Sequence, residues 1–223
     1  TGSNGSITGC TIRDLGAGNG IVLQSNSSPT IRSNTIKNNI YHGIVADWNG
    51  TGNPLIISNT LLDNGVVNGV KTYTGMNIKH YCTARIGSNT IQGSNYGIYW
   101  EDYGSANTYW TGSYDYLAGQ NTVTLNNMGL VASGHSNPLF GDYDFTQGQP
   151  HYYGSCNNIL THSIWKAQAT NYSWILAEGN WWGVAPPNQI YVDGTSYVYS
   201  GYYGKPFQPC PSGGGGGAIA AEG

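Results

Sequence analysis

The chain has 223 residues and a formal net charge of −3, and only 9% of its residues are charged. This length suits one sizeable domain, and so sparse a charge argues against electrostatic binding to nucleic acid or to an anionic membrane surface. No stretch approaches the roughly 18 apolar residues that a membrane span requires.

A segment of similar sequence recurs along the first part of the chain. Its clearest copy runs from Ile31 to Asn39 and is followed by a Gly-Ile pair at residues 43–44. The equivalent positions of five copies are Cys10, Asn34, Asn59, Asn89 and Asn121, at intervals that grow from 24 to 32 residues. A repeat of this period predicts a solenoid, in which each copy is stable only when it is stacked on its neighbours.

Each copy holds short strands separated by turns, which predicts an all-β fold, a parallel β-helix of about six to seven rungs with loop insertions on one side. Apolar side chains should be buried in stacked columns formed by Ile31, Ile56, Ile86, Ile36, Leu61 and Ile91. Two columns of Asn side chains should stack at the turns, the first formed by Asn34, Asn59, Asn89 and Asn121, and the second by Asn39, Asn64 and Asn126 with Ser94 interrupting. The alternative is a β-sandwich with Asn-rich turns, but the register over five copies argues against it.

The copies become longer from about Met76 onward. The additional residues fall in 76–82, 99–116 and 134–154, and such insertions often carry binding sites. We expect the β-helix to cover residues 1–189, a closing strand or hairpin to cover 190–211, and a Gly-rich linker or tail to cover 212–223. Either Trp181 or Trp182 should close the end of the core, because neighbouring residues of a strand point to opposite faces.

The Ile-x-x-Asn-Thr-Ile repeat with its Gly-Ile pair resembles that of right-handed parallel β-helix proteins. This is the pectate-lyase-like superfamily of polysaccharide lyases, polygalacturonases and secreted bacterial repeat proteins. The stretch from Asn180 to Gly183, Asn-Trp-Trp-Gly, is similar to a signature that ends many of the secreted bacterial type. The resemblance implies the fold and its right hand. The chain has neither the calcium-binding Asp cluster of the lyases nor the paired Asp motifs of the polygalacturonases, so no catalytic residue is transferred from the family.

Alignment of the Gly-Ile segments places several polar side chains on the outward face of one sheet. In this alignment Asp47, Tyr73 and Glu101 form one outward row, with Lys71 and Tyr99 beside it. Asp47 and Glu101 would lie roughly 9 to 10 Å apart, at the upper limit for an inverting glycosidase. The catalytic candidates are therefore Asp47, Glu101 and Lys71, although two carboxylates on a solenoid surface more often serve only solubility.

The candidate binding residues are aromatic, because Tyr and Trp suit contacts with sugars or with a neighbouring subunit. They are Tyr73, Tyr99, Tyr109, Trp110, Tyr143, Tyr152 and Tyr153. His80, beside Lys79, is a weaker candidate for the base of a β-elimination. The five histidines lack metal-ligand spacing and no cofactor motif is present, so we expect neither a metal nor a cofactor.

Four cysteines lie far apart in the sequence, at Cys10, Cys82, Cys156 and Cys210. An even number in a chain with few charges favours disulfides, without indicating their pairing, and an oxidising compartment. We therefore expect a secreted, extracellular or cell-surface protein. Four free buried thiols are the alternative.

Three functions are compatible with these features. The first is a non-catalytic extracellular structural protein that associates with itself through a contact between residues 1–12 of one copy and residues 181–203 of the next, and that forms filaments where this contact does not close. The second is a polysaccharide lyase or glycoside hydrolase acting beside Asp47 and Glu101. The third is a carbohydrate-binding module. The expected partners are thus further copies of the chain and a polysaccharide, and whether the protein is an enzyme stays open, with the balance against it.

Overall fold

The computed structural model describes residues 4–24, 27–47, 53–106, 109–110, 113–114, 119–146, 149–153, 157–178, 180–183 and 189–199. The regular structure of these residues is β-strand throughout. Among them, no helix has the length and apolar character needed to cross a membrane.

Most strands belong to three parallel sheets. Sheet A contains, in spatial order, β1 (Ser6–Thr8), β4 (Thr30–Arg32), β7 (Leu55–Ile57), β12 (Thr83–Gly87) and β15 (Ser105–Ala106). Sheet B contains β2 (Thr11–Arg13), β5 (Thr35–Lys37), β8 (Thr60–Leu62), β13 (Thr90–Gln92), β18 (Thr122–Thr124) and β22 (Asn158–Ile159). Sheet C contains β3 (Ile21–Gln24), β6 (Ile44–Asp47), β11 (Thr74–Lys79), β14 (Tyr96–Glu101), β19 (Met128–Ala132), β23 (Trp165–Ala169) and β25 (Ile190–Val192).

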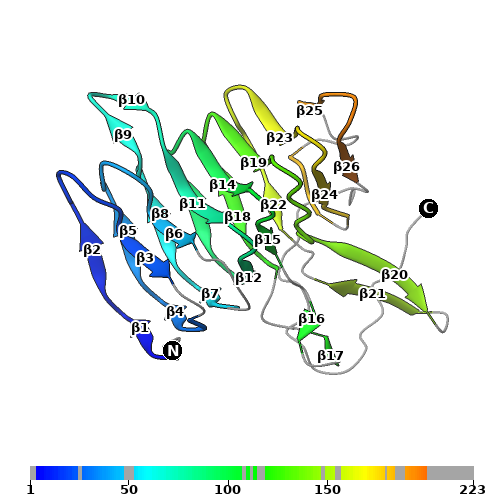
Figure 1. Ribbon diagram of the computed structural model, residues 1–223, viewed down its shortest axis with the longest axis horizontal. Helices are drawn as coiled ribbons and strands as arrows, with labels where there is room; N and C mark the ends of the chain where they lie inside the picture. Colours follow the sequence, from blue (N-terminus) through cyan, green and yellow to red (C-terminus); the bar gives the residue numbers. More distant parts are fainter. Residues whose placement is uncertain are drawn as a thin grey trace.

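Each strand pairs with the corresponding strands of the turns of chain before and after it. Ile31, for example, pairs with Ile7 on one side and with Ile56 on the other. Successive turns of the chain therefore lie side by side along the long axis of the molecule, as Figure 1 shows. This arrangement is a parallel β-helix, as the repeat predicted.

The core is made of stacked inward columns. The predicted members Ile31, Ile56, Ile86, Ile36, Leu61 and Ile91 are all buried, with at most 3% of their surface exposed. Strand residues on either side of them point outward, which follows from the alternation of side chains along a strand. The predicted columns are confirmed.

The Asn columns are also confirmed, and the first is longer than predicted. The Nδ2 amide of Asn34 donates to Oδ1 of Asn59 at 3.0 Å, and the same contact repeats from each Asn to the next. The series continues through Asn89, Asn121, Asn157 and Asn180. In the second column Asn39 donates to Asn64, while Ser94 and Asn126 are linked through the Ser94 backbone N–H.

The Gly of each Gly-Ile pair is required for steric reasons. A Cβ atom on Gly43 would lie 2.6 Å from the carbonyl oxygen of Gly75 and 3.0 Å from Nδ2 of Asn64. The backbone of sheet C thus approaches the next rung and the second Asn column too closely for any side chain. Repeats of this fold need Gly where the Asn column fills the corner.

The C-terminal rungs continue the solenoid. Trp182 is fully buried and Trp181 is not, so one Trp of the pair packs into the core as expected. The strand β24 (Trp174–Leu176) pairs in parallel with β26 (Tyr197–Tyr199), and β25 extends sheet C. Residues 190–199 therefore form strands paired to the preceding rung, not a hairpin, whereas residues 200–223 lie outside the described part of the chain.

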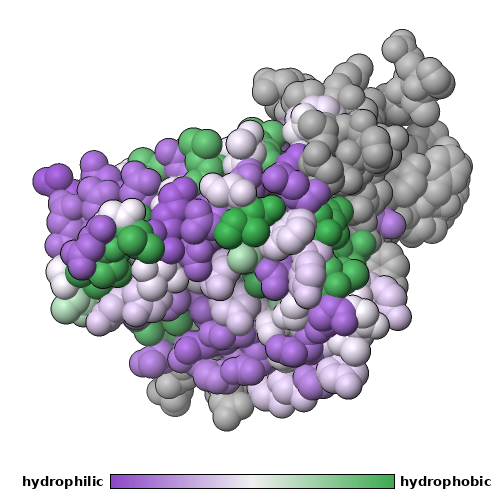
Figure 2. Space-filling model, turned by 90° about the horizontal axis from the view of Figure 1, so that it is seen from above, coloured by the Kyte–Doolittle hydropathy of each residue, from purple (hydrophilic) through white to green (hydrophobic). Residues whose placement is uncertain are grey.

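In the part of the chain that the structure describes, three antiparallel hairpins interrupt the rungs. They are β9 (Val66–Val67) with β10 (Val70–Lys71), β16 (Tyr109–Trp110) with β17 (Ser113–Tyr114), and β20 (Asp142–Thr146) with β21 (Gln149–Tyr153). In Figure 1 the last two project from the lower side of the solenoid, whereas β9 and β10 lie at its upper edge. Figure 2 shows that hydrophilic residues cover most of this upper face, with the hydrophobic residues in separate patches.

The expected pairing of all four cysteines is not found. Cys10 and Cys82 are both free, and Cys156 and Cys210 lie outside the described residues. Cys82 packs in the hydrophobic core, where burial raises the pKa of its thiol. Cys10 is exposed and takes the place of the first Asn of its column, with its backbone N–H donating to Asn34. Both cysteines thus occupy positions of the repeat, and neither forms a cross-link.

Candidate functional site

The ends of the sheet C strands bring several ionisable side chains together. Lys79 pairs in register with Asp47 on one side and with Glu101 on the other, and Gln24 precedes Asp47. We call Gln24, Asp47, Lys79 and Glu101 the polar row. The predicted alignment of Asp47 with Glu101 two rungs away is correct, but the residue between them is Lys79.

The predicted positions of Lys71 and Tyr73 are wrong. Residues 66–71 form the inserted hairpin, so the third strand of sheet C begins at Thr74, and Asn77 occupies the place expected for Lys71. Lys71 instead donates from Nζ to the backbone oxygen of Leu125. The ring of Tyr73 packs edge-on against Tyr41, with ring centroids 5.1 Å apart. Neither residue therefore belongs to the polar row.

Two side chains, those of His80 and Lys79, hold the carboxylate of Asp47 in place. Its Oδ1 lies 2.5 Å from Nδ1 of His80, and its Oδ2 lies 3.4 Å from Nζ of Lys79. Burial acts to raise the pKa of this carboxyl, but the His80 hydrogen bond and the Lys79 charge together outweigh it and lower the pKa. The other ring nitrogen of His80, Nε2, lies 3.5 Å from Oδ2 of Asp102. His80 thus bridges two carboxylates that lie on the rungs before and after its own.

Glu101 has a different set of neighbours. Its Oε1 accepts a hydrogen bond of 3.0 Å from Nδ2 of Asn77, which points outward from the neighbouring strand. Burial, followed by the charge of Glu101, raises the pKa of Tyr99 to about 12, against a hydrogen bond to Ser133 that lowers it. Tyr99 therefore stays protonated at neutral pH. The sequence correctly placed Tyr99 beside Glu101, but it missed Asn77.

A column of stacked aromatic rings runs next to the polar row, and the sequence analysis did not predict it. Its rings stack in sequence, with centroids 4.6 Å apart from Tyr81 to Tyr103, 5.2 Å from Tyr103 to His135 and 5.4 Å from His135 to Tyr172. All four residues have a positive φ between 59° and 64°, so they occupy the same left-handed position after sheet C. The signal in the sequence is a recurring aromatic ring at the second or third residue after the strand.

Stacking limits what the aromatic column can bind. The faces of the inner rings, Tyr103 and His135, are each covered by their neighbours, so a sugar ring has no free face there. The three Tyr residues of the column are exposed, Tyr81 by 54%, Tyr103 by 45% and Tyr172 by 64%. The column therefore stiffens the edge of the polar row and adds hydrogen-bonding groups beside it.

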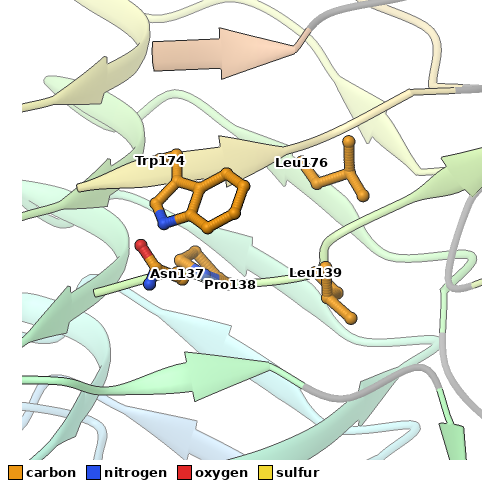
Figure 3. A pocket seen from close by; sticks show the side chains of 5 residues that line it. All are labelled: Asn137, Pro138, Leu139, Trp174 and Leu176. Atoms are coloured by element: carbon orange, nitrogen blue, oxygen red, sulfur yellow. The ribbon is translucent and has the colours of Figure 1, made fainter. Parts of the chain in front are cut away.

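A pocket of about 150 Å³ lies on a different part of the surface. It is lined by Asn137, Pro138, Leu139, Trp174 and Leu176, and Figure 3 shows the Trp174 indole next to Asn137 and Pro138. Asn137 supplies the only side-chain amide of the lining. The polar row, together with His80 and Asp102, offers a ligand many more hydrogen bonds than this pocket does and is the stronger candidate site.

The remaining predicted binding residues cannot be placed in either site. The side chains of Tyr109, Trp110, Tyr143, Tyr152 and Tyr153 lie outside the described part of the structure, although their backbones form hairpin strands. Within the described residues, no group of three or more His, Cys, Asp or Glu side chains has the arrangement of a metal site.

Comparison with known proteins agrees with this architecture. Residues 1–110 match the model of a family described as a right handed beta helix region. The chain is a β-helix repeat protein. Because the parallel sheets extend the same arrangement beyond residue 110, the right-handed parallel β-helix covers the later rungs as well. No curated protein and no solved structure matches this β-helix repeat protein.

Proposed function

We propose that this β-helix is a non-catalytic carbohydrate-binding protein and that a glycan lies across the polar row beside the aromatic column. The observation that carries the proposal is the concentration of charge at this place. The chain has only 8 basic and 11 acidic residues, yet Asp47, Lys79, Glu101 and Asp102 gather on three adjacent rungs. A carboxyl group whose pKa is shifted by specific charged neighbours, as that of Asp47 is, marks a candidate functional site.

The contacts among these side chains favour binding. Hydrogen bonds and ion pairs hold Asp47, His80 and Glu101 in place before any ligand arrives, so little side-chain entropy is lost when a ligand binds. Carboxylates, amides and Tyr hydroxyls are suitable partners for sugar hydroxyl groups. The rungs also repeat along the solenoid, as sugars repeat along a polysaccharide chain.

Catalysis has less support. A glycosidase needs one carboxyl group that is protonated near neutral pH to act as a general acid. His80 and Lys79 lower the pKa of Asp47, which makes this carboxyl a poor proton donor. Lys71, the third predicted catalytic residue, lies on the inserted hairpin.

The proposal is tested with the full chain and a panel of neutral, acidic and basic polysaccharides. Affinity gel electrophoresis should detect binding to at least one of them, and the double variant Asp47→Ala/Glu101→Ala should weaken it by about tenfold or more. Assays for new reducing ends and for unsaturated sugar products should stay negative. Product formation that the double variant loses would instead establish an enzyme.

Self-association is a second candidate function, as an extracellular structural element. It is favoured by the ends of the core, where Ile7 and Ile12 at one end and Ile190 and Val198 at the other are only partly buried. Stacking one copy on the next would cover these side chains.

A further inference from the structure

The candidate site carries an excess of negative charge. Its three carboxylates, Asp47, Glu101 and Asp102, face a single ammonium group, that of Lys79. The formal charge of the cluster is therefore −2 when His80 is neutral and −1 when it is protonated. Lys79 pairs with Asp47, so Glu101 and Asp102 are the carboxylates whose charge is least compensated.

The two less compensated carboxylates are accessible from the solvent side. Asp102 has a side chain that is 61% exposed, and its ion-pair partner is Nε2 of His80 at 3.5 Å. Glu101 is partly exposed and accepts from the neutral amide of Asn77. A positively charged group approaching from solvent would meet both carboxylates on the same turn of the chain.

A buried acceptor beside them lacks a donor. Asn77 is 97% buried, with 3% of its surface exposed, and its Nδ2 atom donates to Glu101. This contact fixes the orientation of the amide and leaves its Oδ1 atom, within the described part of the chain, with no hydrogen-bond partner. Buried acceptors in folded proteins are normally paired, so this unpaired oxygen adds an uncompensated partial negative charge beside Glu101.

We infer that the ligand of this site is a glycan with free amino groups, that is, a polymer or oligomer of 2-amino-2-deoxy sugars. The inference rests on the proposed carbohydrate binding and adds the charge of the sugar to it. A protonated amine supplies the positive charge that this place lacks and N–H donors for the carboxylates of Glu101 and Asp102. Uronic acid polymers carry carboxylates and would be repelled, and N-acetylated sugars are neutral.

The test uses the full chain and three sets of oligosaccharides of equal length: glucosamine oligomers, their N-acetylated forms and galacturonic acid oligomers. Isothermal titration calorimetry at pH 6 should give at least about tenfold tighter binding, about 1.4 kcal/mol, for the free amines than for the N-acetylated forms. This preference should decrease when the ionic strength is raised to about 0.15 M and beyond. Glu101→Gln and Asp102→Asn should each weaken amine binding about three- to tenfold.

A matched control separates site binding from general attraction to an acidic protein. Asp14 follows β2 at the end of sheet B, and its side chain is 54% exposed, so Asp14→Asn removes the same charge elsewhere. This variant should bind the amines as the unchanged protein does. Equal losses in Asp14→Asn and Glu101→Gln would overturn the inference. Equal or tighter binding of the N-acetylated or acidic oligomers would overturn it too, while leaving carbohydrate binding in place. Failure of all three sets to bind would remove the proposed function itself.

Discussion

At the corner between sheet B and sheet C, Asn residues of the second column pack against Gly residues of the sheet C segments. Each Asn of the second column points toward the backbone of the neighbouring rung, and each Gly of sheet C leaves room for it. At Gly20 and Gly43 an added Cβ would meet both a carbonyl oxygen and an Asn amide. The Gly residues are therefore required by packing, since neither has a positive φ.

Substitution of Gly43 by Ala should consequently destabilise the solenoid. The new methyl group would lie 2.6 Å from the Gly75 oxygen, so the rungs would have to separate, at a cost of about 1–3 kcal/mol. Urea denaturation followed by circular dichroism would measure this loss. Gly16→Ala is the control, because a Cβ at Gly16 meets nothing within 4 Å. Equal stability of the two variants would contradict this account of the Gly column.

At the level of strands, the sequence predicted sheets A and B well because the Ile and Asn positions repeat without interruption. The third strand of sheet C was misplaced because Gly69-Val70 imitates the Gly-Ile pair that Gly75-Met76 actually provides. The signal that distinguishes them is the Asn68-Gly69 dipeptide between two Val-rich segments, which is typical of a two-residue hairpin. Asn68 and Gly69 indeed both have positive φ.

The candidate site was therefore predicted only in part. Asp47, Tyr99 and Glu101 were placed correctly because they belong to strands whose register was right. His80, Asp102 and the aromatic column lie in turns, where pairing partners depend on backbone conformations that periodicity does not report. The hairpins β16–β17 and β20–β21 have strand backbones, but sequence alone gives no register between them and the rungs.

A buried histidine, His162, and a half-buried one, His42, should make the fold sensitive to acid. Burial lowers the pKa of His42 to about 4, with a further contribution from Lys79, and Nδ1 of His42 accepts from the backbone N–H of Thr74. Burial also lowers the pKa of His162 to about 4; the nearby carbonyls of Val123 and Asn126 act in the opposite direction, but neither ring nitrogen has a hydrogen-bond partner among the described residues. Both rings are therefore neutral in the folded protein at neutral pH.

The free energy of unfolding should thus be constant above about pH 6.5 and decrease as the pH falls from there toward 4, because the unfolded chain takes up protons that the folded chain cannot. Urea titrations at several pH values would measure this decrease. His162 occupies the position of the second Asn column after Asn126, so His162→Asn should reduce the acid sensitivity. His135→Asn, at an exposed position, should leave it unchanged. An unaltered pH profile in His162→Asn would show that His162 is not the group responsible.

At the scale of the whole molecule, the two ends of the solenoid differ from its middle. In the described part of the chain β1, β2 and β3 are edge strands at one end, and β25 and β26 are edge strands at the other. Edge strands carry unpaired backbone groups that can pair with a second chain. Partly buried core residues lie on the same rungs, so stacking of two copies would satisfy backbone groups and bury apolar surface together.

We therefore expect head-to-tail association of copies, with an interface above roughly 1,000 Å² in total. Sedimentation velocity at increasing protein concentration should detect polymers, because a heterologous contact that does not close produces open chains. Ile7→Asp or Thr11→Lys would place a charge on the first rungs and should shift the protein to monomers, with an unchanged circular dichroism spectrum. Leu125→Lys is the control, since Leu125 is 53% exposed on a turn away from both ends and its substitution should leave polymers intact. A single monomeric species at high concentration would exclude this mode of assembly, and it would leave the glycan site as the functional feature of the molecule, because Asp47, Lys79 and Glu101 do not lie on the end rungs.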